Sequence, residues 1–133
     1  MSAQFKKLIR SFGYALKGIG YATTTQLNFR VHLVATLVTI TLGIGLHISI
    51  NEWVWIILCI TLVLAAEMFN TAIEFLTDLV SPGYHPKAGH VKDVAAGAVL
   101  LCAIFAVVVG VIIFGPKILS LLHYAAKNQG HSF

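Results

Sequence analysis

The chain has 133 residues, of which 58% are hydrophobic and 11% are charged, and its mean hydropathy is +0.87. This balance excludes an ordinary soluble domain and indicates a small integral membrane protein. The net charge of +4 comes from cations spread over loops and chain ends. That spread is typical of membrane orientation, and we expect no nucleic-acid partner. Cys59 and Cys102 lie in apolar runs without metal-type spacing, so we interpret them as packing residues.

Residues 2–22 predict an amphipathic helix that lies on the membrane surface. Its apolar side chains recur at helical spacing, and its cations fall largely elsewhere around the helix. The apolar positions are Phe5, Leu8, Ile9, Phe12, Leu16 and Ile19. The first cations are followed by neither a continuous apolar core nor a small-residue cleavage site, so we do not expect a signal peptide here.

Three apolar segments predict membrane spans at residues 33–50, 53–80 and 94–114. A polar connector at residues 23–30 precedes the first span, and Asn51 and Glu52 form a polar turn before the second. The second span begins at Trp53 and Trp55, which are typical of the aromatic belt at a membrane surface.

Prolines and glycines predict where the later segments stop. Residues 81–86 contain two prolines and a glycine, which break the second span, and a polar loop continues through residues 87–93. The third span ends at residues 115–116, and residues 117–133 form a tail. The sequence therefore predicts an all-α integral membrane protein with a single domain over residues 1–133.

The lysines and arginines predict the orientation in the membrane. Seven of the nine precede the first span or lie between the second and third. These seven are Lys6, Lys7, Arg10, Lys17, Arg30, Lys87 and Lys92. Because cations favour the cytoplasmic side, we expect the N-terminus and the 81–93 loop in the cytoplasm.

Four polar residues form what we call the acidic stripe of the second span: Glu67, Asn70, Glu74 and Asp78. Steps of three, four and four keep them within about 80° of one another around a helix. A charged side chain at bilayer depth costs about 2.5–3.5 kcal/mol on insertion scales, so such residues are rarely idle. A purely structural alternative is that the stripe only joins helices. Four such residues on one face, however, favour binding of a cationic group.

The residue types of the stripe suit phosphoryl transfer. A carboxylate in poorly solvated surroundings can act as a general base. Carboxylates together with an amide can hold Mg²⁺, and a nearby lysine can stabilise the charge of a transferring phosphoryl group. No G-x-x-x-x-G-K-[ST] loop is present, so any nucleotide site must be built differently.

The motif Glu67-x-x-Asn70-Thr71-Ala72-Ile73-Glu74-x-x-x-Asp78, followed by His85 and Lys92-Asp93, resembles the signature of the small prokaryotic diacylglycerol kinase family. The resemblance covers about residues 7–116. It implies a homotrimer of three-span subunits in the bacterial cytoplasmic membrane, each with a surface helix. It also implies Mg²⁺ and ATP-dependent phosphorylation of a membrane-lipid hydroxyl, at sites between neighbouring subunits.

The resemblance also implies roles for individual residues. Glu67 corresponds to the general base at the lipid hydroxyl, Glu74 to a metal ligand, and Asn70 and Asp78 to supporting groups. The nucleotide-binding positions are Lys7, Tyr14, Lys17, Gly83, Tyr84, His85, Lys92 and Asp93. The substrate-binding positions are Arg10, Asn28, Phe29, Arg30 and Glu67, with residues 28–30 at the lipid-facing entry of the first span.

One position departs from the family's pattern. Three residues before Phe29 the family usually has a second acidic metal ligand, and this chain has Gln26. An amide oxygen can still coordinate Mg²⁺, but it brings no charge. We therefore expect weaker metal binding, a different role for Gln26, or compensation by a neighbouring acid.

The sequence leaves alternatives for the lipid substrate and for the kind of function. The segments at residues 28–32, 81–82 and 92–100 resemble the undecaprenol kinase branch more than the diacylglycerol branch, so we favour undecaprenol and keep diacylglycerol as the alternative. A non-catalytic transporter or partner subunit is a remoter hypothesis. A transport path is poorly supported, because between residues 54 and 66 only Thr61 and Cys59 could continue it.

Overall fold

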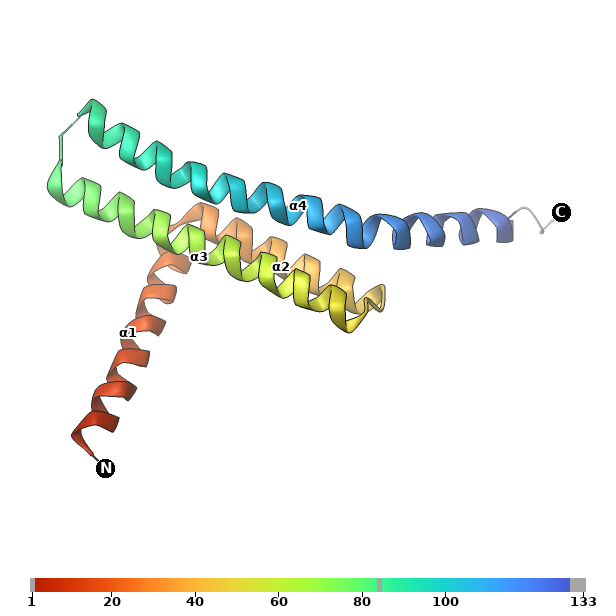
Figure 1. Cartoon of the computed structure of the whole chain (residues 1–133), viewed down its shortest axis with the longest axis horizontal. Coiled ribbons are helices and arrows are strands. Elements are labelled where there is room, and N and C mark those ends of the chain that lie inside the picture. Colours follow the sequence, from red (N-terminus) through yellow and green to blue (C-terminus); the bar gives the residue numbers. More distant parts are fainter. Residues whose placement is uncertain (1, 84, 130–133) are drawn as a thin grey trace.

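The computed structural model describes residues 2–83 and 85–129, and in these ranges it contains four helices and no strand (Figure 1). They are α1 (Ala3–Thr25), α2 (Leu27–Gly45), α3 (Ile50–Val80) and α4 (Pro86–Gln129). Helices α2, α3 and α4 are each long and apolar enough to cross a membrane. The predicted all-α membrane fold with three spans and a preceding helix is confirmed.

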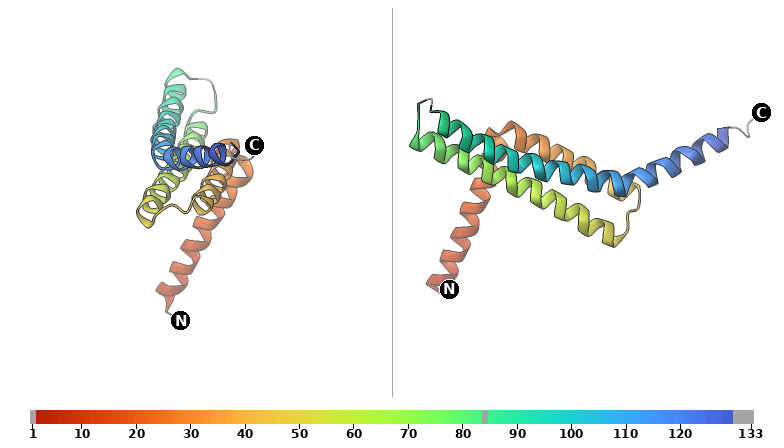
Figure 2. Two further views of the ribbon diagram at one scale, coloured as in Figure 1. Left: turned by 90° about the vertical axis from the view of Figure 1, so that its right-hand side faces the viewer. Right: turned by 45° about the horizontal axis from the view of Figure 1, so that its top comes forward.

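Helix α3 holds the bundle together. It packs most extensively against α4 and also contacts α2, so the three long helices lie side by side (Figures 1 and 2). Helix α1 leaves this bundle at a steep angle and exposes nearly all of its side chains, with only Ala22 buried among its described residues. This geometry suits a helix that lies across the ends of membrane spans. It extends three residues beyond the predicted bounds of 2–22.

The connector predicted at residues 23–30 is helical except at Gln26. The hydroxyls of Thr23, Thr24 and Thr25 donate to carbonyl oxygens four residues earlier, at 2.9, 3.0 and 2.8 Å, so these polar side chains are satisfied inside α1. Gln26 alone is extended, with φ −99° and ψ 115°, and α2 begins at the next residue. The predicted first span, 33–50, therefore starts six residues too late and extends five residues past the end of α2 at Gly45.

The turn predicted at Asn51 and Glu52 lies instead at residues 46–49. His47 has φ 51°, and α3 begins immediately after Ser49. Ser49 Oγ accepts from Glu52 N at 3.3 Å, while Glu52 Oε2 accepts from Ser49 N at 2.6 Å. This capping box satisfies two backbone donors at the helix start. The Ser-x-x-Glu spacing was visible in the sequence, and it marks the start of α3 better than residue polarity did.

The polar loop predicted through residues 87–93 is wrong, because these residues form the first turns of α4. Pro86 occupies the first helical position, where its fixed φ favours a helix and its missing N–H costs nothing. His85 Nδ1 accepts from Lys87 N at 3.2 Å and satisfies one free donor there. The break between α3 and α4 is therefore shorter than predicted.

The helix of the third predicted span does not stop at residues 115–116. Helix α4 runs through Pro116 to Gln129, so most of the predicted tail at residues 117–133 is helical. Proline removes one helical hydrogen bond and bends a helix, but apolar helix-forming residues on both sides can sustain it. The predicted span at 94–114 is thus the middle part of a helix of 44 residues.

Two ion pairs hold α3 and α4 together at opposite ends. Glu52 pairs with Lys117 at 3.2 Å, and Asp78 pairs with Lys92. Twenty-six residues separate the two acids, which corresponds to about 39 Å of helix, against a hydrocarbon core of about 30 Å. The two pairs are therefore far enough apart to lie at opposite surfaces of a membrane. A buried cluster of Ile48, Ile56, Ile113 and Phe114 packs near the Glu52 end.

Gly43 allows the close approach of α2 to the start of α3, which gives a stability prediction. A Cβ at Gly43 would lie 2.8 Å from Trp53 Cη2 and 3.1 Å from Ile48 Cδ1, whereas one at Gly45 meets nothing within 4 Å. Both Gly→Ala changes gain about 0.5–1 kcal/mol of helix preference. We expect Gly43→Ala to lose about 1–3 kcal/mol from overpacking.

Thermal unfolding in detergent measures the difference. Gly43→Ala should lower Tm, while the matched control Gly45→Ala should keep or raise it. An equal Tm for both variants would contradict the close packing of Gly43 against Trp53.

Candidate functional site

The acidic stripe runs along α3 from a buried to an exposed end. Glu67 is 2% exposed and Asn70 is 5% exposed, whereas Glu74 is half-buried and Asp78 is exposed. The spacing predicted one shared face, and the burial confirms that this face turns into the protein at Glu67 and Asn70. The stripe therefore connects an interior position with water.

Helix α1 contacts α3 beside this transition. Tyr21 and Phe75 pack edge to face, with ring centroids 5.2 Å apart. A Cβ at Gly18 would lie 3.9 Å from Met68 Cε. If α1 lies along a membrane surface, that surface crosses α3 between Met68 and Phe75, so Glu67 lies on its lipid side and Asp78 on its water side. The stripe is thus positioned where a lipid headgroup and a water-soluble molecule can meet.

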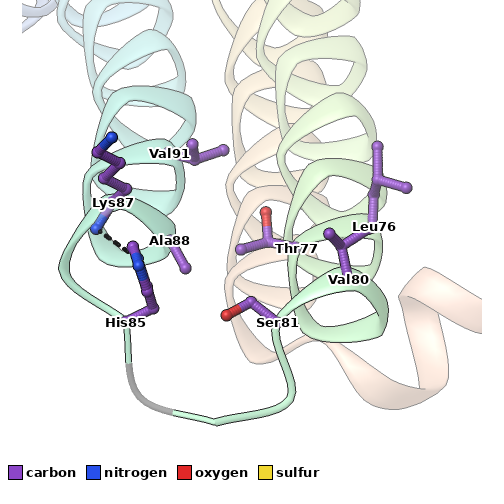
Figure 3. A pocket seen from close by; sticks show the side chains of 8 residues that line it. All are labelled: Leu76, Thr77, Val80, Ser81, His85, Lys87, Ala88 and Val91. Atoms are coloured by element: carbon purple, nitrogen blue, oxygen red, sulfur yellow. Dashed lines mark hydrogen bonds between the residues drawn. The ribbon is translucent and has the colours of Figure 1, made fainter.

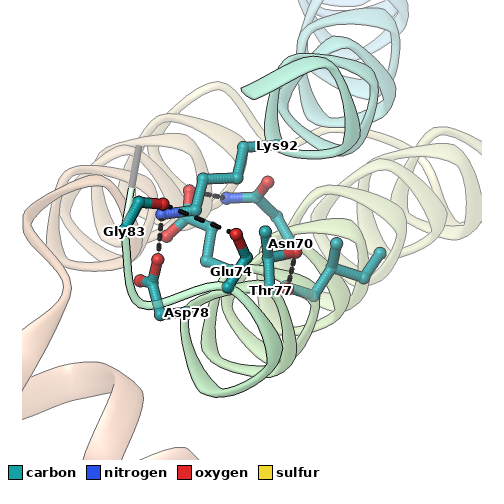
Figure 4. Close-up of polar contacts among 8 residues, drawn as sticks. Asn70, Glu74, Thr77, Asp78, Gly83 and Lys92 are labelled. Carbon is teal, nitrogen blue, oxygen red and sulfur yellow. Dashed lines mark hydrogen bonds and ion pairs between the residues drawn. The ribbon is translucent and has the colours of Figure 1, made fainter. Parts of the chain in front are cut away.

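Asn70 orients Glu74 and has one unsatisfied atom. Its Nδ2 donates to Glu74 Oε1 at 3.0 Å, as Figure 4 shows. Its Oδ1 is buried and has no hydrogen-bond partner. The reverse amide orientation would put two acceptors against each other, so this oxygen must face away from Glu74. A buried acceptor without a partner is costly, which favours a cation or donor beside Asn70 when the site is filled.

Lys92 brings α4 to the open end of the stripe. Its Nζ forms an ion pair with Asp78 Oδ1 (Figure 4). Both side chains remain partly accessible, at 38% and 64% exposure, so the pair is hydrated. Hydrated pairs contribute at most about 1 kcal/mol, and Lys92 can therefore exchange Asp78 for another anion at small cost. The predicted nucleotide residue Asp93 is also exposed on α4.

Of the loop residues predicted to cover a nucleotide, His85 lines a recess between the end of α3 and the start of α4. This recess has a volume of about 470 Å³ and is shown in Figure 3. Its lining residues are Leu76, Thr77, Val80, Ser81, His85, Lys87, Ala88 and Val91. Gly83 accepts a hydrogen bond of 3.5 Å from Ser81 Oγ. Tyr84, the remaining predicted loop residue, lies outside the described residues.

The predicted residues of α1 share a helix face but stay apart from the stripe. Lys7, Arg10, Tyr14 and Lys17 follow one another at steps of three, four and three, and all are exposed. Lys17 Nζ lies 5.9 Å from the centre of the Tyr14 ring. The structure therefore provides a basic, aromatic face on α1, and no hydrogen bond or ion pair among the described residues connects it to α3.

The entry of α2 differs from expectation at Phe29. Asn28 and Arg30 are exposed, but Phe29 is 3% exposed and packs inside the chain rather than facing lipid. Gln26, predicted to hold metal, is half-buried and donates from Nε2 to Thr25 Oγ1 at 3.4 Å. That hydrogen bond does not bring Gln26 to Glu74.

His32 is a candidate that the sequence interpretation left unassigned. It lies on α2 and is half-buried. It also lines an apolar groove of about 350 Å³ between α2, α3 and α4, together with Thr36 and Thr39. His32 is three residues after Phe29 and shares its helix face, but the sequence carried no signal for this position, because the burial of Phe29 is known only from the structure.

The residues present fit a magnesium ion only if water and substrate phosphates supply the rest of its ligands. Among the described residues, no group of three His, Cys, Asp or Glu side chains could hold a metal by itself. Mg²⁺ usually takes one or two carboxylates and completes its shell with water and substrate phosphates. The Glu74 carboxylate and the unsatisfied Asn70 Oδ1 supply that smaller donor set.

Comparison with known proteins identifies the family. Residues 13–114, more than half of the chain, match the family described as prokaryotic diacylglycerol kinase. The chain belongs to this family. Both the family and the enzyme class, a kinase, are therefore as the sequence predicted.

Individual relatives carry two different names. An undecaprenol kinase of Bacillus subtilis is 36% identical over 115 residues, which cover 86% of this chain and 94% of the relative. A diacylglycerol kinase of Synechocystis is 44% identical over 86% of this chain and 66% of its own length. A diacylglycerol kinase of Escherichia coli is 33% identical over 78% of this chain and 85% of its own.

Proposed function

We propose that this protein is an ATP-dependent kinase that phosphorylates the hydroxyl group of a membrane lipid. The observation that carries the proposal is the acidic stripe, which passes from the buried Glu67 to the exposed Asp78 beside the surface helix α1. A lipid hydroxyl stays near the membrane surface, whereas a nucleotide arrives from water. A catalytic site for both must cover this boundary.

The side chains divide the reaction between them. Glu67 accepts the proton of the lipid hydroxyl, and the freed oxygen attacks the γ-phosphorus of ATP while ADP leaves. Asn70 holds the Glu74 carboxylate in place through their 3.0 Å hydrogen bond. A magnesium ion at Glu74 and Asn70 Oδ1 would neutralise phosphate charge when bound. Lys92 moves from Asp78 to the phosphoryl group and stabilises its negative charge.

The nucleotide is held by two groups of residues on different elements. One group lies near the start of α4 and consists of Gly83, His85, Lys92 and Asp93. The other lies on the basic face of α1 and consists of Lys7, Tyr14 and Lys17. Since that face stays apart from the stripe of its own chain, we propose that neighbouring subunits of a homotrimer complete each site. Tyr14 and Lys17 would contact the nucleotide, and Arg10 the lipid headgroup.

The cation distribution supports a site on the cytoplasmic side of a bacterial membrane, where ATP is available. Undecaprenol is the proposed lipid, since residues 28–32 and 92–100 resemble the undecaprenol branch and one relative carries that name. Diacylglycerol is the alternative, because two of the relatives above are named for it.

A substrate comparison tests the function. Purified protein in vesicles receives labelled ATP, Mg²⁺ and either undecaprenol or diacylglycerol at equal mole fraction. We expect transfer of label to lipid, with kcat/KM higher for undecaprenol. A preference for diacylglycerol would replace the proposed substrate, and no transfer to either lipid would overturn the kinase assignment.

Replacing the proposed base tests the role of Glu67. Glu67→Gln keeps the size of the side chain, but one acceptor oxygen becomes an amide NH2 and the side chain cannot accept the proton. We expect kcat to fall by about 10²–10⁴-fold, the usual contribution of a general base, with Tm nearly unchanged. The control Glu52→Gln makes the same chemical change at the other end of α3 and should retain turnover per folded protein. Full activity in Glu67→Gln would mean that another group takes the proton.

Restoring an acid at Gln26 tests its proposed link to metal. In Gln26→Glu the side chain gains a charge that attracts Mg²⁺, so half-maximal activity should need less of the ion. The measurement is a magnesium titration at saturating ATP and lipid. An unchanged magnesium requirement would remove Gln26 from the metal site and leave Glu74 and Asn70 as its donors.

A further inference from the structure

The part of α4 that follows Lys117 lies beyond the membrane span. Lys117 pairs with Glu52 in the first turn of α3, at the surface opposite the acidic stripe. Counting from Lys92, the helix has already risen about 38 Å at Lys117, which exceeds the roughly 30 Å hydrocarbon core. Residues 118–129 nevertheless remain helical. We call them the C-terminal segment.

The C-terminal segment is amphipathic. At 100° per residue the apolar side chains of residues 118–128 fall within an arc of about 160° that contains no polar residue of this range. The apolar arc contains Ile118, Leu119, Leu121, Leu122, Ala125 and Ala126. The other side carries Ser120, His123, Tyr124, Lys127 and Asn128, next to Lys117. The large apolar residues here are 41–61% exposed, so the structure leaves this arc uncovered within the chain.

The apolar arc continues an exposed apolar side of α4. Ile104, Val108 and Val111 are exposed on the span and lie on one line of the helix. Ile118 and Leu122 follow on the same line, at further steps of seven and four residues. A single apolar surface therefore runs from the middle of the membrane onto the C-terminal segment.

Pro116 directs the segment toward that surface. Its ring crowds the carbonyl of Ile112 and opens the helix on the proline side, so the helix bends away from Pro116. Pro116 lies on nearly the opposite side of the helix from Ile118, two residues later. The bend thus tilts the segment toward its own apolar arc. Figure 2 shows this last part of α4 turning away from the bundle.

We infer that the C-terminal segment is a membrane-surface anchor on the side opposite the acidic stripe. Its apolar arc lies against the lipid chains, while His123 and Lys127 face negatively charged headgroups. A broad apolar arc beside a basic polar side is typical of helices that lie in a membrane surface. Packing of the segment against the same segment of a second copy is disfavoured. Such a contact between two helices requires a narrow stripe of large apolar residues, and two of the six residues of the apolar arc are alanines.

Spin labelling of the full-length protein tests the anchor. Labels are attached at Leu122→Cys on the apolar arc and at its neighbour His123→Cys on the polar side, in a Cys59→Ala, Cys102→Ala background. The protein is reconstituted in phosphatidylcholine vesicles with and without phosphatidylglycerol. Collisions with oxygen, which concentrates in lipid, are compared with collisions with a water-soluble nickel chelate.

We expect the label at position 122 to collide several-fold more with oxygen than with the chelate, and the label at 123 to show the reverse. The contrast should increase with phosphatidylglycerol. A label at 122 that is shielded from both reagents would show packing between copies and overturn the inference. Chelate access at both positions would place the segment in water and would also overturn the inference. A contrast independent of phosphatidylglycerol would refute the headgroup contact.

Discussion

The register between α3 and α4 is the constraint on which the rest of the structure depends. An ion pair joins the two helices at each end: Glu52 with Lys117 at one end, and Asp78 with Lys92 at the other. The two acids on α3 are almost as far apart along their helix as the two lysines on α4, so both ion pairs form in one alignment. A slip of one helical turn would separate both pairs. Hydrated ion pairs add little stability. They specify alignment, while packing between the helices supplies most of the attraction.

This alignment makes the polar residues of α3 useful rather than merely costly. Glu67 and Asn70 are withdrawn from water because α3 lies between α2 and α4. The same packing carries the end of α3 past the level of α1, so Glu74 and Asp78 reach solvent. One helix therefore provides an interior carboxylate suited to a lipid hydroxyl and outer groups suited to phosphate. No separate nucleotide-binding domain is needed for this arrangement.

Helix boundaries were the part of the fold that polarity predicted least well. The threonines at residues 23–25 look like a connector, yet their hydroxyls bond back to their own helix. Pro86 looks like a terminator and instead begins α4, and Pro116 lies inside it. In each case a residue that can break a helix occurs where its side chain or missing donor is tolerated. The Ser49 and Glu52 pair, in contrast, was a readable local signal.

The sequence by itself determined the three spans, the shared face of the acidic stripe and the family. The spans and the shared face follow from hydrophobic length and from the 3.6-residue period, both of which act within one segment, whereas the family follows from the resemblance of a motif. Only the tertiary structure decided that His32 lines a groove between α2, α3 and α4, that Phe29 points inward, and that Lys92 reaches Asp78. The reason is physical: these relations depend on the rotation and offset of separate helices, which are set by packing between segments distant in the chain.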